Sequence, residues 1–142
     1  MATSSVPTVK ANLVTQLQAR AGLTGVQVTN GPPLPNPSRE FIWVGTAEGT
    51  QAQSAMGGLR REEYGLEVVI SVEREGTDIV AADARCFALV AELENQLRTD
   101  PTVNAAVEHA EMGGFRLGEF VGADGMRRVS ELTVTVDCGN WI

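Results

Sequence analysis

The single histidine of the 142-residue chain lies in the stretch that most resembles a metal site. His109 stands between Glu108 and Glu111, and a histidine with nearby carboxylates is a ligand set that zinc and related metals accept. The chain has no second histidine to complete such a set. We therefore interpret the group as a solvated, charged surface and expect no bound metal. A small metal-dependent enzyme is the alternative, which zinc in the purified protein would favour.

The other reactive residues form no recognisable catalytic pattern. A serine nucleophile on a Gly-x-Ser-x-Gly elbow is absent, and Lys10, the only lysine, has no glycine-rich neighbourhood that could cradle a phosphate. Cys86 and Cys138 are too far apart in sequence for a metal or redox motif, so we expect reduced, buried packing residues. The sequence thus predicts neither an enzyme nor a cofactor.

Charge also limits the possible partners. The net charge of −7 argues against a protein that grips nucleic-acid phosphates, but not against a channel through which DNA slides. Glu63, Glu67 and Glu73 lie at positions that share one side of a predicted strand. They are evenly spread, as in a solvated face, whereas acid–base catalysis needs carboxylates that converge in a cleft.

Two arginine pairs and two tryptophans are the candidates for contacts with other proteins. Each arginine pair adjoins a glycine-rich segment, where it forms a local positive spot in an acidic chain. These arginines have two equally compatible interpretations. They dock onto an acidic patch of a neighbouring protein, or they form ordinary exposed ion pairs. The predicted subunit or tail interface comprises Arg60, Arg61, Trp43, Arg127, Arg128 and Trp141.

Hydrophobic periodicity predicts two helices and five strands in a single domain, residues 1–142. An amphipathic stripe predicts helices over 7–21 and from Asp78 to about Arg98, while alternation or apolar runs predict the strands. The predicted strands cover 26–29, 41–44, 62–75, 115–121 and 126–138. Residues 102–112 are compatible with either a helical turn or the start of a strand.

This element order predicts an α+β fold with a mostly antiparallel sheet and both helices on one face. A proline-rich loop over 30–37 and a long polar loop over 45–61 separate the early strands. The second loop has little to bury, so we expect it to become ordered on assembly. The tail 139–142 ends in two apolar residues that a partner could cover. No apolar run could span a membrane, and the polar N-terminus lacks a secretory signal.

The whole pattern resembles the tail terminator, or tail completion, proteins of long-tailed bacteriophages. The landmarks are a strand that ends in Val44-Gly45, the segment Glu63-Tyr64-x-Leu-x-Val-x-Ile-x-Val72, and Gly76-Thr77-Asp78 before a long helix. They stand in the order helix, proline-rich loop, strand, polar loop, strand, helix and hairpin over nearly the full chain.

The resemblance implies a structural virion protein that assembles as a homohexameric ring in the host bacterial cytoplasm. Such a ring caps the tail tube at its head-proximal end, stops elongation and presents a surface to the head–tail connector. DNA passes through it, and Glu63, Glu67 and Glu73 would line that channel. Head-closure (stopper) and tail-tube proteins of the same phages are alternatives. A binding module with a pocket under the proline-rich loop is another, which a thermal shift on a metabolite would favour.

Overall fold

The computed structural model describes residues 3–33, 39–53, 58–122 and 125–142. One five-stranded sheet has the strand order β1-β2-β3-β5-β4. The elements in chain order are α1 (Val6–Gln18), a 3-10 helix (Ala21–Leu23), β1 (Gln27–Asn30), β2 (Glu40–Gln53), β3 (Arg60–Glu75), α2 (Ile79–Thr99), β4 (His109–Val121) and β5 (Arg127–Trp141). The prediction of an α+β fold with this element order is confirmed.

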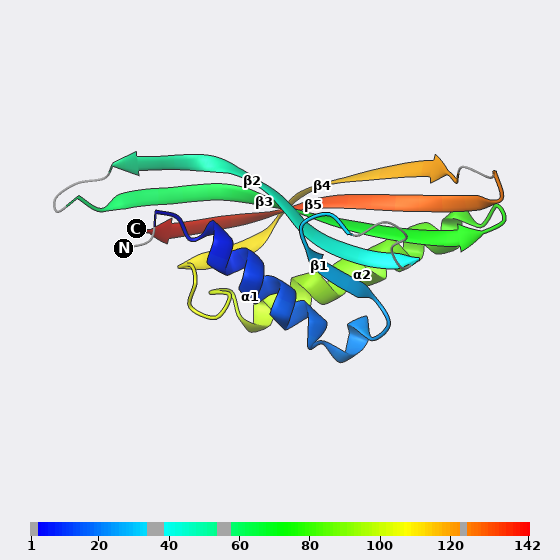
Figure 1. Cartoon of the computed structure of the whole chain (residues 1–142), viewed down its shortest axis with the longest axis horizontal. Coiled ribbons are helices and arrows are strands. Elements are labelled where there is room, and N and C mark those ends of the chain that lie inside the picture. Colours follow the sequence, from blue (N-terminus) through cyan, green and yellow to red (C-terminus); the bar gives the residue numbers. More distant parts are fainter. Residues whose placement is uncertain (1–2, 34–38, 54–57, 123–124) are drawn as a thin grey trace.

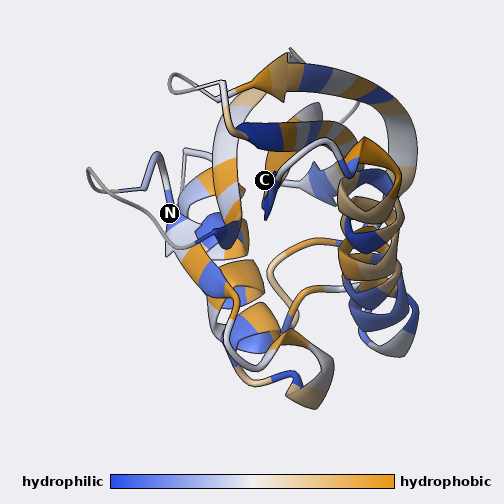
Figure 2. Ribbon diagram, turned by 90° about the vertical axis from the view of Figure 1, so that its right-hand side faces the viewer, coloured by the Kyte–Doolittle hydropathy of each residue, from blue (hydrophilic) through white to orange (hydrophobic). Residues whose placement is uncertain are grey.

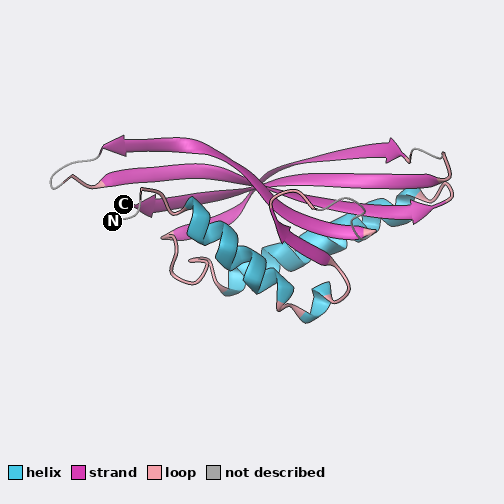
Figure 3. Ribbon diagram, viewed as in Figure 1, coloured by secondary structure: helices cyan, strands magenta, loops and turns pink. Residues whose placement is uncertain are grey.

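Both helices lie on one face of the long, twisted sheet, and the opposite face carries no helix (Figures 1 and 3). Viewed from the end, the sheet arches over the helices, and apolar segments of helix and strand face each other (Figure 2). The largest fully buried side chains lie in this layer: Leu13, Leu17, Ile42, Leu66, Ile70, Leu89, Leu93 and Leu132. We call the helix-covered face the inner face and the other the outer face.

β3 and α2 form for the local reasons that the sequence indicates. Alternate residues of β3, from Tyr64 to Val72, are buried on the inner face. The apolar stripe of α2 packs on them, with Leu89 and Leu93 fully buried. Asp78 is the N-cap, since its carboxylate accepts a hydrogen bond from the Ala81 N–H at 3.1 Å. No helix in the described residues is long and apolar enough to cross a membrane.

The prediction of a polar loop over 45–61 is wrong for most of that segment. β2 continues to Gln53 and β3 begins at Arg60, and the two pair in register from Ala47 opposite Leu66 to Gln53 opposite Arg60. A bulge between Val44 and Ala47 marks the point where the apolar strand becomes polar. Backbone pairing supplies the hydrogen bonds here, so the strand forms without side chains to bury. Residues 54–57 lie outside the described residues.

Two further expectations need correction. Residues 139–141 belong to β5, where Trp141 pairs with Arg61, so they are not a free tail. β1 pairs with β2 in parallel, although strands joined without a helix were expected to be antiparallel. The chain between Asn30 and Glu40 is long enough to return past the four residues of β1. Residues 34–38, within the predicted proline-rich loop, lie outside the described residues.

The ambiguous stretch 102–112 divides into a turn and a strand. Val103, Asn104 and Ala105 all have positive φ, an arrangement that is unusual for residues other than glycine. Asp100 stabilises this turn, because its carboxylate accepts hydrogen bonds from the Asn104 N–H at 2.7 Å and the Thr102 hydroxyl at 2.8 Å. These bonds lower the pKa of Asp100. β4 then starts at His109.

Candidate assembly surfaces

The outer face of the sheet is predominantly acidic. Glu63, Glu67 and Glu73 alternate with the buried residues of β3, so all three share this face, as the sequence predicts. The register places further charges beside them on the neighbouring strands. The carboxylates of this face are Glu48, Glu63, Glu67, Glu73, Glu75, Glu111, Glu131 and Asp137, and the arginines of β3, β4 and β5 on it are Arg61, Arg116 and Arg127.

The three predicted glutamates differ in how much of their charge is compensated. Glu73 forms an ion pair with Arg127 at 3.0 Å, and its side chain is 27% exposed. Glu63 approaches Arg61 at 3.4 Å, with its side chain 67% exposed. Glu67 is exposed and makes no ion pair within the described chain. Glu67 and Glu63 therefore contribute more negative potential to the outer face than Glu73 does.

Arg61 makes its side-chain contacts with other residues of this chain. Its guanidinium forms an ion pair with Glu108 at 2.9 Å and lies 5.3 Å from the centroid of the Trp141 ring, a cation–π distance. The side chain is 21% exposed. Arg60 pairs with Ile142 through two backbone hydrogen bonds. The predicted pair is thus part of the sheet, where Arg61 and Trp141 hold the ends of β3 and β5 together.

The second predicted arginine pair lies at the opposite end of the same two strands. Arg127 pairs with Glu73, while the Arg128 guanidinium donates to the carbonyls of Gly125 and Arg127. Trp43 lies apart from both pairs. It is on the outer face of β2, half-buried, and its ring packs closely over Gly45. The structure therefore brings Arg61 and Trp141 together but separates them from Trp43 and from the second arginine pair.

An apolar patch that the sequence analysis missed lies along β4 and the adjoining flank of α2. Phe115 of β4 is 67% exposed and makes an edge-to-face contact with Phe87 of α2, with ring centroids 6.0 Å apart. Val121 is exposed on the same face, whereas Phe120, opposite Val129, is exposed on the outer face. Exposed aromatic side chains that touch each other, as Phe87 and Phe115 do, are candidates for a contact with another molecule. The alternation of β4 is interrupted by a bulge between Met112 and Phe115, which hides this pattern in the sequence.

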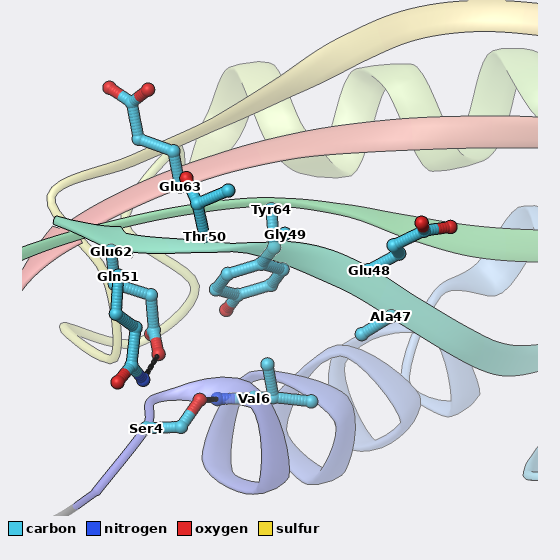
Figure 4. Close-up of a pocket in the computed structure, with 10 residues that line it drawn as sticks. All are labelled: Ser4, Val6, Ala47, Glu48, Gly49, Thr50, Gln51, Glu62, Glu63 and Tyr64. Atoms are coloured by element: carbon cyan, nitrogen blue, oxygen red, sulfur yellow. Dashed lines mark hydrogen bonds between the residues drawn. The ribbon is translucent and has the colours of Figure 1, made fainter.

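A hollow of about 210 Å³ lies between the start of α1 and the strands β2 and β3 (Figure 4). Its central charged group, Glu62, is only 3% exposed. One Glu62 oxygen accepts hydrogen bonds from the Ser5 N–H at 2.9 Å and the Ser5 hydroxyl at 2.6 Å, and the other accepts one from the Gln51 amide at 2.8 Å. The carboxylate thus caps α1 from a distant strand, a structural role.

Hydrogen bonding determines the charge state of Glu62. Burial by itself raises the pKa of a carboxyl group. Here, hydrogen bonds from Ser4, Ser5 and Gln51 outweigh that effect and hold the pKa of Glu62 below its ordinary value. Tyr64 donates to or accepts from the Ser5 hydroxyl at 3.0 Å, and burial raises the pKa of its phenol. The raised pKa of Tyr64 and the lowered pKa of Glu62 both lie away from neutral pH. Neither group is therefore suited to exchange a proton with a substrate near neutral pH.

A second charged cluster, also missed in the sequence, connects three elements on the inner face. Glu40 of β2 accepts from Arg74 of β3 at 2.6 Å and from Arg85 of α2 at 2.9 and 3.1 Å. Burial opposes the charge of Glu40, but the two arginines prevail and lower its pKa. Glu40 lies 34 residues from Arg74 and 45 from Arg85 in the sequence, so the pairing has no local signal there.

His109, Glu108 and Glu111 were the residues whose types most resembled a metal site. No group of three or more His, Cys, Asp or Glu side chains in the part of the chain that the structure describes could hold an ion. His109 lies on the outer face beside Arg61, where both approach Gly139. Cys86 and Cys138 are free and buried, as predicted, in different parts of the core.

Comparisons with known proteins find similarity among solved structures. No protein-family model matches the chain, and no curated protein sequence matches it. Among solved structures, it is similar to a chain from the virion of a native gene transfer agent particle, with a TM-score of 0.54 and 16% sequence identity. The match covers 98% of this chain and 100% of that chain. The two chains therefore share a fold over essentially their full lengths.

Proposed function

We propose that this chain is a structural protein of a phage-like virion and acts there as the tail terminator. Six copies form a ring that caps the tail tube, stops its elongation and presents a surface to the head–tail connector. The observation that carries this proposal is the end-to-end fold similarity with a virion chain of a gene transfer agent. The outer face of the sheet and its exposed β4 patch add surfaces suited to assembly.

The outer face is the proposed wall of the central channel. It carries no helix, and carboxylates outnumber arginines on it. A basic wall would retain DNA by many phosphate contacts, whereas an acidic wall lets it pass without specific binding. The two helices then lie on the outside of the ring. Glu63 and Glu67 carry most of the effect, because Arg127 compensates Glu73.

The strand ends are the proposed contacts with the tail tube and the head connector. Arg60, Arg61 and Trp141 lie at one end of the β3–β5 pair, and Arg127 and Arg128 lie at the other. If the strands run along the ring axis, these two ends face opposite sides of the ring. Arginine and tryptophan are well suited to protein interfaces at such positions.

Electron microscopy and native mass spectrometry of the purified protein test the ring. We expect a closed ring of six copies with a central hole. Long stacked tubes would indicate a tail-tube protein, and a monomer at all concentrations would contradict the proposal. Loss of the gene distinguishes the remaining roles: a terminator mutant makes tails of uncontrolled length, whereas a head-closure mutant makes normal tails that fail to join heads.

DNA ejection tests the channel wall. Changing Glu63, Glu67 and Glu73 together to Gln leaves the fold intact, because all three lie outside the core. We expect rings to form but DNA release from the particles to be slowed. The control is Glu94→Gln on α2, which removes a charge from the helix side. Equal ejection rates in all three particles would place the outer face away from the DNA.

A further inference from the structure

The sheet has two unpaired edges among the described strands. Among the described strands, β4 pairs only with β5. The Ala110 N–H on its other edge donates to the Pro101 carbonyl, so that edge is free from Glu111 to Val121. At the opposite side, β1 covers β2 only from Phe41 to Val44. β2 therefore has a second free edge from Ala47 to Gln53, where all but Ala47 are exposed. Free edges of this length invite pairing with another strand unless they are protected.

The number of long strands determines how two such edges can meet. β2, β3, β5 and β4 alternate in direction, because each neighbouring pair is antiparallel. Rotation about an axis along the strands preserves the direction of each strand. The β4 edge of one copy therefore runs antiparallel to the β2 edge of the next, which is the more stable pairing. This contact is heterologous, the kind that closes a ring.

One residue of each edge carries a charge opposite in sign to the other, and the two lie on the same face. Arg116 lies on the outer face of β4 and is exposed, and Glu48 lies on the outer face of β2 and is exposed. Neither forms an ion pair within the described residues. Figure 4 shows Glu48 directed away from α1, on the side of β2 opposite to Ala47. Because a continued sheet keeps its faces, these two charges would lie on the same surface of a joined sheet.

The inner-face residues of the two edges complement each other in size. Phe115 and Leu117 of β4 project on the inner face, since they pair with the core residues Val134 and Leu132. Gly49 and Ala47 of β2 occupy inner-face positions with little or no side chain. An antiparallel register that places Arg116 opposite Glu48 also places Phe115 opposite Gly49 and Leu117 opposite Ala47. Large side chains then meet small ones, which permits close packing.

We propose that the free edge of β4 in each subunit pairs with the free edge of β2, from Ala47 to Gln53, in a second copy of this chain. The register places Arg116 opposite Glu48. The inference rests on the proposed ring and names its subunit contact. Within one chain, the paired residues across β2, β3, β5 and β4 place Ala47 at the same level as Met112. The proposed register aligns it with Leu117 of the neighbour. Met112 and Leu117 pair with Val136 and Leu132 of β5, so the stagger is about four residues per subunit, and closure of a sheet into a barrel requires such a stagger.

Charge exchange tests the register. Arg116→Glu and Glu48→Arg each place like charges opposite each other, so we expect each to reduce the ring fraction in native mass spectrometry by at least tenfold. The double variant restores the pair and should return the ring fraction to that of the wild type. Lys10→Glu on α1 is the control, with the same change of charge as Arg116→Glu and no expected effect. Thermal denaturation verifies that every variant is folded.

Cysteine cross-linking gives an independent readout. A mixture of Arg116→Cys and Glu48→Cys proteins should form disulfide-linked dimers under oxidation, whereas neither protein alone should. The native cysteines are buried and do not interfere. Dimers from Arg116→Cys alone would mean that two β4 edges pair with each other and would overturn the proposal. Rings without cross-links and without sensitivity to charge exchange would overturn this contact but leave the ring itself; absence of any ring would overturn both.

Discussion

The Glu62 carboxylate offers the most direct test of how the first helix is attached to the sheet. Replacing Glu62 by Ala removes hydrogen bonds that include two from Ser5 and one from Gln51. A hydrogen bond to a charged group contributes about 1.5–3 kcal/mol, and an unsatisfied buried N–H costs about 1–3 kcal/mol. Water that enters the hollow offsets part of this loss. We expect the free energy of unfolding to fall by about 2–4 kcal/mol, as these contributions are not additive.

Thermal and urea denaturation measure this effect. For a chain of this size, the expected loss corresponds to a decrease in Tm of roughly 6–15 °C. Glu63→Ala is the matched control, because Glu63 is adjacent in sequence but exposed and weakly paired. Its replacement should change stability by no more than about 0.5 kcal/mol. Equal effects of the two substitutions, or a loss below about 0.5 kcal/mol for Glu62→Ala, would refute the attachment of α1 to the sheet through Glu62.

The pH dependence of the free energy of unfolding tests whether the negative charge of Glu62 stabilises the fold. The folded state lowers the pKa of Glu62, so its stabilising effect is present above the unfolded pKa, which is about 4.3 for glutamate. It is lost as the pH falls through the lower, folded pKa. The stability difference between wild type and Glu62→Gln should therefore be constant near neutral pH and shrink below about pH 4. An unchanged difference at pH 3 would mean that the carboxylate charge is not involved.

Two further predictions follow from buried groups. Glu40→Gln leaves Arg74 and Arg85 facing each other without a carboxylate, so we expect a loss of about 1–3 kcal/mol in urea denaturation; full stability of the variant would contradict the cluster. Burial raises the pKa of Cys86 to about 12 and that of Cys138 to about 11, so neither thiol should react with a thiol reagent at pH 8 in the folded protein. Both should react in denaturant, and rapid modification of the native protein would refute their burial.

The sequence by itself determines the elements whose side chains repeat with a fixed period. Tyr64 to Val72 alternate between core and surface, and the stripe of α2 recurs at helical spacing, so both can be recognised from neighbouring residues alone. The same alternation places Glu63 and Glu67 on one face of the sheet. Element order then limits the fold to an α+β sheet with the helices on one side.

Only the tertiary structure decides which distant segments pair. Residues Ala47–Gln53 form a strand because the β3 backbone satisfies their hydrogen bonds, and their polar side chains give no sign of it. The register of β3 and β5 sets Arg61 over Trp141 and within reach of Glu108, contacts that the arginine pair in the sequence does not indicate. Such contacts depend on strand register and on the path of the chain. These are global properties, and residue types and spacing alone do not encode them locally.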